Sequence, residues 1–280
     1  MTTQVAEKET KVQTVAGTLD ALAFKVQKAP IFSQSGVEIK GYEQIQRIDN
    51  GQTLSIVSPG YELVQHMESL QPAVQLLGSE GWKVKASHIE RYGARAYVEL
   101  HRIDKAFTVV GEKVGERLML RNSYDKSSSL IFEFGGLVLW CLNGATSPVG
   151  GMGFSGHHTG DLRKDLNKFI GKLAEIEAGL GTRLIEEYSQ LDKKVSPEIA
   201  REIIKRSLGE RREDTVLQYW QTGIGRDGEM NAWNLYNGVT QFLTHDYIGS
   251  WDRRERLNAQ AFELIAGFVK TGALPAEEVK

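Results

Sequence analysis

The sequence predicts an α+β protein with a strand-rich first half and a helical second half. Up to about residue 155, short segments alternate apolar and polar residues with the period of two that strands show, and Gly, Asn and Pro separate them. From residue 162 onward, apolar residues recur every three or four positions, the period of an amphipathic helix. We therefore expect an antiparallel β-meander of five to seven strands with one inserted helix, and a helical half packed on it.

Four segments are expected along the chain. Residues 1–14 and 273–280 are polar and lack an apolar period, which predicts loose tails. Residues 15–155 form the expected sheet region and residues 156–272 the helical region. Because the apolar faces of both regions need cover, we expect them to form one composite domain.

The first half reads as strands around a single helix. Residues 41–48 and 53–57 predict a hairpin, because Asn50-Gly51 supplies the positive φ of a tight turn. Helical spacing from Leu63 to Leu77 predicts the inserted helix, which Pro72 is expected to kink or divide. Further strands are expected at 82–88, 94–100, 107–110, 116–124 and 129–139, with a turn at 125–127.

The second half reads as a series of helices. An apolar stripe from Leu162 to Leu184 predicts a helix of about six turns. Ser196-Pro197 is typical of a helix start, because serine caps helices and proline is tolerated at the first position. The remaining helices are expected at 197–208, 213–222, 230–246 and 253–271. The glycine-rich segment 144–160 is expected to be a hinge or a binding loop.

Composition excludes several classes of protein. With 41% hydrophobic and 25% charged residues, the chain is ordinary for a globular protein. Neither a signal peptide nor an apolar run long enough to span a bilayer is visible, so we expect a cytoplasmic protein. The single cysteine, Cys141, excludes an internal disulfide and predicts a buried, inert thiol. A net charge of −2 argues against a globally basic coat protein but permits a local basic groove.

The most metal-like cluster is His157-His158 with Asp161. Adjacent histidines rarely chelate one ion, and further ligands are not spaced nearby, so we expect no metal. Two interpretations remain: Thr159 or Asp161 caps the following helix while the histidines pack in the loop, or the imidazoles contact a phosphate beside the helix N-terminus. The glycines at 150–156 lack the Lys-Ser/Thr ending of a phosphate-binding loop, and no other cofactor is expected.

Cations and rings on the predicted strands suggest contact with nucleic acid. Alternation places Lys83 with Lys85 on one strand face, and Arg95 with Tyr97 and Arg117 with Arg121 on others. If these strands are neighbours, they form a basic, partly aromatic floor for phosphates and bases; the alternative is an ordinary polar, solvent-exposed face. The candidate nucleic-acid-binding residues are Lys83, Lys85, Arg95, Tyr97, Arg117, Arg121, Tyr124, Lys126, His157, His158, Arg163 and Lys164.

Four segments, over about residues 30–268, resemble the phage/plasmid-like protein family, an uncharacterised-domain family. They are Pro59–His66, Arg121–Asp125, Cys141–Gly144 with His157–Gly160, and Asn231–His245. The chain departs from the pattern at Gly238, where alanine is common. The signature residues of the last segment are Trp233, Asn237, Thr240 and His245. The first three share one helix face, which is typical of a polar-tipped core seam more than of a catalytic site.

The resemblance implies an origin in phages, plasmids or other mobile elements, and a fold similar to that of the single-strand annealing recombinases, which form rings around single-stranded DNA. We therefore hypothesise a single-stranded DNA-binding, strand-annealing protein that acts as a homo-oligomer in recombination or replication, without catalytic residues. One alternative is an enzyme acting on nucleic acid or a nucleotide around His157, His158, Asp161 and His245. Another is a protein–protein module such as a host-defence antagonist.

Overall fold

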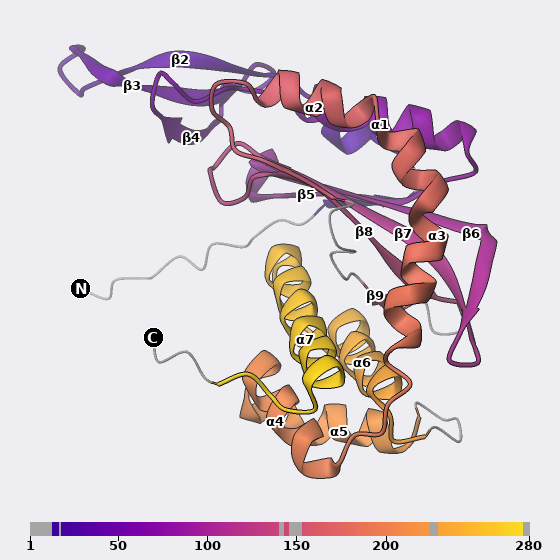
Figure 1. Ribbon diagram of the computed structural model, residues 1–280. Coiled ribbons are helices and arrows are strands. Elements are labelled where there is room, and N and C mark those ends of the chain that lie inside the picture. Colours follow the sequence, from indigo (N-terminus) through magenta and orange to yellow (C-terminus); the bar gives the residue numbers. More distant parts are fainter. Residues whose placement is uncertain (1–12, 17, 140–142, 146–152, 224–228, 277–280) are drawn as a thin grey trace, which may run out of the picture. The chain divides into compact units, whose positions relative to one another are not determined.

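The computed structural model describes residues 13–16, 18–139, 143–145, 153–223 and 229–276 (Figure 1). Two antiparallel sheets lie in the N-terminal half and helices fill the C-terminal half, so the predicted α+β class is confirmed. Cys141 and part of the glycine-rich segment 144–160 lie outside the described residues, as do most of both expected tails.

The larger sheet has seven strands. Along it lie β1 (Gln13–Ala16), β5 (Lys83–Glu90), β6 (Arg95–Val109), β7 (Glu112–Ser123), β8 (Leu130–Val138) and β10 (Phe154–Gly156), and β9 (Asn143–Ala145) pairs with β8. The strands predicted at 94–100 and 107–110 are one continuous strand, β6. Gln13 and Thr14, expected in a loose tail, pair with β5 instead.

The smaller sheet has the order β2 (Val26–Phe32), β3 (Glu38–Arg47) and β4 (Thr53–Val57). The predicted hairpin around Gly51 is confirmed, and Gly51 has the expected positive φ of 72°. β2 escaped prediction because Pro30 breaks the strand signal. The Gln65 side chain pairs with the backbone of Val26, accepting from its N–H at 3.0 Å and donating to its C=O at 2.8 Å.

Two predicted helices differ from the structure in whether they are broken. α1 (His66–Ser79) runs through Pro72 as a single helix and buries Leu70 and Leu77 on one side. The predicted six-turn helix is instead two helices, α2 (Leu162–Ile170) and α3 (Leu173–Ser189). They separate at Gly171, where the residue with the most backbone freedom weakens helix propagation.

The remaining helices are α4 (Pro197–Leu208), α5 (Glu213–Gln221), α6 (Ala232–Gln241) with the following π-helix Phe242–Asp246, and α7 (Trp251–Thr271). Ser196 accepts the N–H of Ile199 at 3.4 Å, which confirms the predicted start of α4. α4 packs on α5 and α7, and α6 packs on the same two helices (Figure 1).

The chain forms two compact units that do not follow a boundary at residue 155. Unit 1 comprises residues 1–100, 119–132 and 154–174, and unit 2 comprises residues 101–118, 133–153 and 175–280. β6, β7 and β8 each contribute residues to both units. One core cluster of unit 1 contains Val26, Ile45, Val57, Tyr61 and Tyr124. The residues of interest for function lie beside this cluster.

Candidate functional site

A pocket of about 430 Å³ lies in unit 1. Three segments line it: the residues after β4, the turn between β7 and β8, and the residues after β10. Its lining residues are Ser58, Tyr61, Lys126, Ser127, Ser128, Ser129, His157, His158 and Thr159. Three of the predicted nucleic-acid-binding residues, Lys126, His157 and His158, are therefore brought together around one cavity.

Backbone and ring contacts hold these segments against one another. Tyr61 and Thr159 form an isolated antiparallel bridge, and the N–H of Glu62 donates to the C=O of His158 at 2.9 Å. The Tyr61 ring stacks on the His158 imidazole, with 4.8 Å between centroids and 6° between planes. The Tyr61 hydroxyl donates to the C=O of Ser123 at 2.9 Å. Tyr61 thus contacts the segment after β10 and the end of β7, from which the lining turn continues.

His158 is buried and uncharged. Its Nδ1 donates to the C=O of Glu62 at 3.1 Å, and because a carbonyl only accepts, Nδ1 must carry the hydrogen. Burial lowers the pKa of His158 below its ordinary value, which favours the neutral imidazole. The other nitrogen, Nε2, is then a lone-pair acceptor, and it is buried without a hydrogen-bond partner. Such an unsatisfied atom is uncommon and calls for a structural or functional explanation.

The turn between β7 and β8 presents Lys126 and three serines to the pocket. Asp125 Oδ1 accepts the N–H of Ser127 at 3.1 Å, which closes the turn. Lys126 has a φ of 60°, a left-handed conformation that glycine or asparagine adopts more readily than lysine. Ser129 Oγ and His157 Nδ1 lie 3.1 Å apart and share a hydrogen bond. The pocket therefore offers an ammonium group, hydroxyls and imidazoles.

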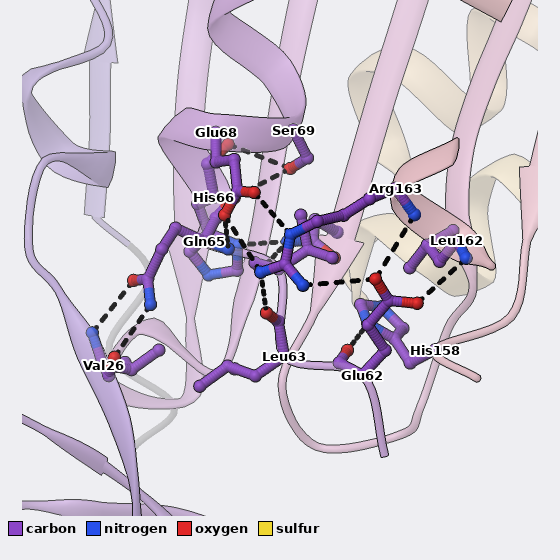
Figure 2. A network of polar contacts seen from close by, with 12 residues as sticks. Val26, Glu62, Leu63, Gln65, His66, Glu68, Ser69, His158, Leu162 and Arg163 are labelled. Atoms are coloured by element: carbon purple, nitrogen blue, oxygen red, sulfur yellow. Dashed lines mark hydrogen bonds and ion pairs between the residues drawn. The ribbon is translucent and has the colours of Figure 1, made fainter. Parts of the chain in front are cut away.

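Glu62 caps α2 from about a hundred residues away (Figure 2). Its carboxylate accepts the N–H groups of Leu162 at 2.9 Å and Arg163 at 3.4 Å. The expectation that Thr159 or Asp161 caps this helix is therefore wrong, because Asp161 makes no side-chain capping bond at the N-cap position. The helix N-terminus is also not an open anion site, since a carboxylate already occupies it.

Arg163 is engaged by the same network (Figure 2). Its guanidinium forms ion pairs with Glu62 at 3.2 Å and Glu68 at 2.6 Å, and donates to the C=O of Leu63 at 2.6 Å. Glu68 in turn accepts the N–H of Gln65 at 3.3 Å, at the start of α1. Arg163 therefore fastens α2 to the segment before α1, and we no longer count it among the cations open to a ligand.

A buried cluster, here called the His66 cluster, consists of His66, Gly93, Asn122 and Tyr124. The His66 ring stacks on Tyr124, with 3.9 Å between centroids, and its Nε2 lies 3.0 Å from the C=O of Gly93. Its Nδ1 accepts from the Asn122 amide at 3.0 Å. Burial lowers the pKa of His66 to about 3, and burial also raises the pKa of Tyr124. Both ring nitrogens of His66 are satisfied, which is typical of a structural histidine.

Three of the four family-like segments converge here. Pro59–His66 supplies Tyr61 and His66, Arg121–Asp125 supplies Asn122 and Tyr124, and His157–Gly160 supplies His158. Sequence reasoning did not propose Tyr61, His66, Asn122 or Ser129 as functional residues. Their contacts join residues about 30 to 100 positions apart, so no local pattern in the sequence indicates them. The one signal that pointed to Tyr61, His66 and Asn122 was their position inside the family-like segments.

The predicted basic floor of the sheet is largely wrong. β5, β6 and β7 are neighbours, as the hypothesis required. However, Tyr97, Arg117 and Tyr124 are at most 2% exposed and Arg121 is 5% exposed, because β7 is buried along its length from Val114 to Ser123.

Ion pairs hold two of these residues. Arg117 pairs with Glu255, with both nitrogen–oxygen distances at 3.2 Å, and Arg95 donates to Asp125 at 3.0 Å. These side chains cannot contact phosphates or stack on bases without leaving their partners. Lys83, Lys85 and Lys126 are exposed, as are His157 and Lys164.

The signature residues of α6 form a core seam. Trp233 Nε1 and Asn237 Nδ2 both donate to Glu112 Oε2, at 3.1 and 3.0 Å, so they share one helix face as predicted. Thr240 is buried and donates to the C=O of Asn237. His245 lies apart from them, exposed in the π-helix. This arrangement supports the structural interpretation of these residues.

Metal-binding clusters and membrane-spanning helices are both absent from the described residues. Within these residues, no group of three or more His, Cys, Asp or Glu side chains is placed to hold a metal ion. No helix in the described ranges combines the length and hydropathy needed to cross a membrane.

Comparison with known proteins identifies one family model that matches most of the chain. The sequence model of the family described as a domain of unknown function, DUF932, matches residues 53–263. The matched span includes every residue that lines the pocket and the His66 cluster. Comparisons with curated proteins and with solved structures found no match.

Proposed function

The chain belongs to the DUF932 family, and we propose that it is a single-stranded DNA-binding protein of mobile-element origin that promotes strand annealing as a homo-oligomer. One observation carries the proposal: Lys126, His157 and His158 line a single pocket together with four serines and a threonine. An ammonium group, hydroxyls and imidazoles are groups that hold phosphate oxygens. Binding that depends on phosphates requires no catalytic residue.

The proposal also includes three exposed lysines of unit 1 that lie outside the pocket lining. Lys83 and Lys85 occupy alternate, exposed positions of β5, so their side chains leave the strand on the same face. Lys164 is exposed on α2, one residue beyond the engaged Arg163. In this proposal, the exposed lysines neutralise the phosphates of the DNA strand, a role that the sequence had suggested for the buried Arg117 and Arg121.

Self-association is part of the proposal, and the smaller sheet supports it. Tyr42 and Ile56 are 57% and 50% exposed. Both face the same side of the sheet, because Ile56 lies opposite Gln44, two residues beyond Tyr42. Exposed apolar side chains on a sheet favour burial against another surface.

The first prediction is a steep dependence of binding on salt. Affinity for single-stranded DNA, measured by fluorescence anisotropy, should fall with a log–log slope of about −0.7 for each phosphate contacted. Lys83→Glu/Lys85→Glu should weaken binding by about tenfold or more and flatten the slope by about 1.4. Lys113→Glu/Lys270→Glu, the same charge change at exposed positions of unit 2, is the matched control.

Three results would contradict the proposal. They are binding that salt does not weaken, equal loss of affinity in the two double variants, and a solution mass that stays monomeric with and without DNA. The rate at which complementary strands anneal should rank the wild type and the two double variants in the same order as their affinity for single-stranded DNA.

The hydrogen bond between Ser129 and His157 favours a second candidate, an enzyme acting on nucleic acid or a nucleotide. A serine hydroxyl within 3.1 Å of an imidazole nitrogen has a base in reach of its proton. If this candidate is right, incubation with oligonucleotides or nucleotides yields product, and Ser129→Ala abolishes turnover while binding persists. Unchanged substrates after incubation with the wild-type protein would remove it.

A further inference from the structure

We propose that the pocket binds a phosphate monoester, at the end of a nucleic-acid strand or on a free nucleotide, in preference to the phosphodiesters along a strand. The inference rests on the proposed function for its choice of nucleic acid and nucleotides as carriers of the phosphate. It adds a specificity that neither exposed lysines nor a basic groove would provide.

The donor set suits a highly charged, compact anion. Lys126 supplies one fixed positive charge, and the hydroxyls of Ser58 and Thr159 lie around the same cavity. The hydroxyls of Ser127 and Ser128 already donate to Asp125 and to the C=O of Ser129, so they can only accept from a ligand. A phosphate monoester carries about −1.5 to −2 charges near pH 7 and three acceptor oxygens. A diester carries a single charge and keeps two of its oxygens in ester bonds, so it satisfies fewer of these groups.

His158 discriminates between the two more directly. The C=O of Glu62 fixes the hydrogen on Nδ1, so Nε2 carries a lone pair. This atom is buried and lacks a partner in the described structure, and it belongs to a residue that lines the pocket. The monoanion of a monoester has a P–O–H group that donates to such a lone pair or transfers its proton to it. A diester has no proton to give near neutral pH, so it would leave Nε2 unsatisfied.

Proton sharing depends on how burial and the bound anion act on the pKa of the His158 imidazole. The second ionisation of a phosphate monoester has a pKa of about 6, and a free imidazole has one of about 6.5. Burial lowers the pKa of His158 in the free protein, and a bound anion would raise it again. Binding near pH 7 should therefore be coupled to the proton shared between ligand and imidazole.

Nearby acidic groups are already compensated. The Glu62 carboxylate is bound to the α2 N-terminus and to Arg163. Asp125 is bound to Arg95 at 3.0 Å and to Arg91 at 3.4 Å. The other titratable groups around His158 are the imidazoles of His157 and His66 and the hydroxyl of Tyr61, none of which is an anion near pH 7. An incoming phosphate therefore meets little repulsion.

The test compares oligonucleotides of one sequence, about 12 nucleotides long, that differ only at their ends. One has hydroxyls at both ends, one a 5′-phosphate and one a 3′-phosphate; a mononucleotide and inorganic phosphate are measured beside them. We expect one phosphorylated strand to bind the full-length protein about tenfold tighter than the hydroxyl strand, because it gains charge-assisted hydrogen bonds. Titration calorimetry in buffers of different ionisation enthalpy should detect proton transfer on binding.

The variants place the effect in the pocket. Lys126→Asn removes the charge at a backbone conformation that asparagine tolerates, so folding should persist while the preference for phosphorylated ends is lost. His158→Phe retains a ring against Tyr61 and should abolish the proton transfer. Lys113→Asn, at an exposed position of unit 2 outside the pocket lining, is the matched control and should keep the preference.

The outcomes separate this inference from the proposed function. Equal affinity for all three strands overturns the inference while the protein remains a DNA-binding protein. Binding of the mononucleotide without affinity for any strand supports the inference, identifies a free nucleotide as the source of the phosphate and contradicts the proposed function. An end preference that survives Lys126→Asn would overturn the assignment of this pocket.

Discussion

Two buried histidines of unit 1 are neutral for the same reason but differ in what surrounds them. His66 has a partner at each ring nitrogen, the Asn122 amide and the Gly93 carbonyl. His158 has a partner at Nδ1, and its buried Nε2 has none. An imidazole satisfied on both sides stabilises the fold, whereas His158 lines the pocket and keeps one buried acceptor without a partner in the described structure. The contacts of His66 are those of a structural residue, and His158 is the histidine on which our proposal of a phosphate site depends.

Protonation of His66 should limit stability in acid. Its pKa is about 3 in the folded protein and about 6.5 in the unfolded chain, so below pH 6.5 the unfolded state takes up a proton that the folded state refuses. Stability from this group is complete above pH 6.5 and is lost as the pH falls toward 3, by at most about 1.4 kcal/mol per pH unit.

His66→Gln is the matched variant, because an amide offers a donor and an acceptor without titrating. Urea unfolding at pH 7, 5.5 and 4.5 should show a smaller loss of stability with acid in the variant than in the wild type. Equal losses in the two proteins would show that His66 is not the group that titrates. His158 and the carboxylates are present in both proteins and cancel in the comparison.

At the scale of elements, residue patterns located most helices and strands but not their surroundings. The period of two correctly placed Arg117 and Arg121 in one strand, β7. It does not reveal whether the polar face is solvated, and here Glu255 covers Arg117 from α7. Glu62 illustrates the same limit, because a cap donated from a distant segment leaves no local signal before α2.

Glu112 should fasten α6 to β7. It accepts hydrogen bonds from Trp233 and Asn237, and its removal would leave two partly buried donors without an acceptor. Glu112→Ala should therefore lower the free energy of unfolding by about 2 kcal/mol. Glu112→Gln keeps a carbonyl oxygen in the same place and should cost less than half as much. Urea unfolding followed by circular dichroism measures both, and equal losses would mean that these hydrogen bonds contribute little.

At the scale of the molecule, the pocket is assembled from segments that the sequence could identify but not combine. The family-like blocks containing Tyr61, Tyr124 and His158 were each recognisable along the chain. Their convergence depends on long-range contacts such as the stack of Tyr61 on His158. Neither periodicity nor turn chemistry specifies which distant segments meet. The sequence therefore predicted candidate binding residues but not the pocket that they line.

The two compact units interleave along the chain, so division at residue 155 should not yield two folded proteins. A fragment of residues 13–155 loses Phe169, whose ring centroid lies 5.2 Å from that of Phe132. It also loses His158, which stacks on Tyr61. A fragment of residues 156–276 loses Arg117 and leaves the carboxylate of Glu255 buried without this partner, a change that typically costs about 3–5 kcal/mol.

We therefore expect neither fragment to show a cooperative urea transition by circular dichroism when produced alone. Co-expression of the two fragments restores both sides of each contact and serves as the control; it should recover a cooperative transition. A sharp transition in the isolated 156–276 fragment would mean that its helices fold independently of the strand residues of unit 2. It would also imply that Arg117 and Glu112 contribute to function or specificity more than to the stability of the helices.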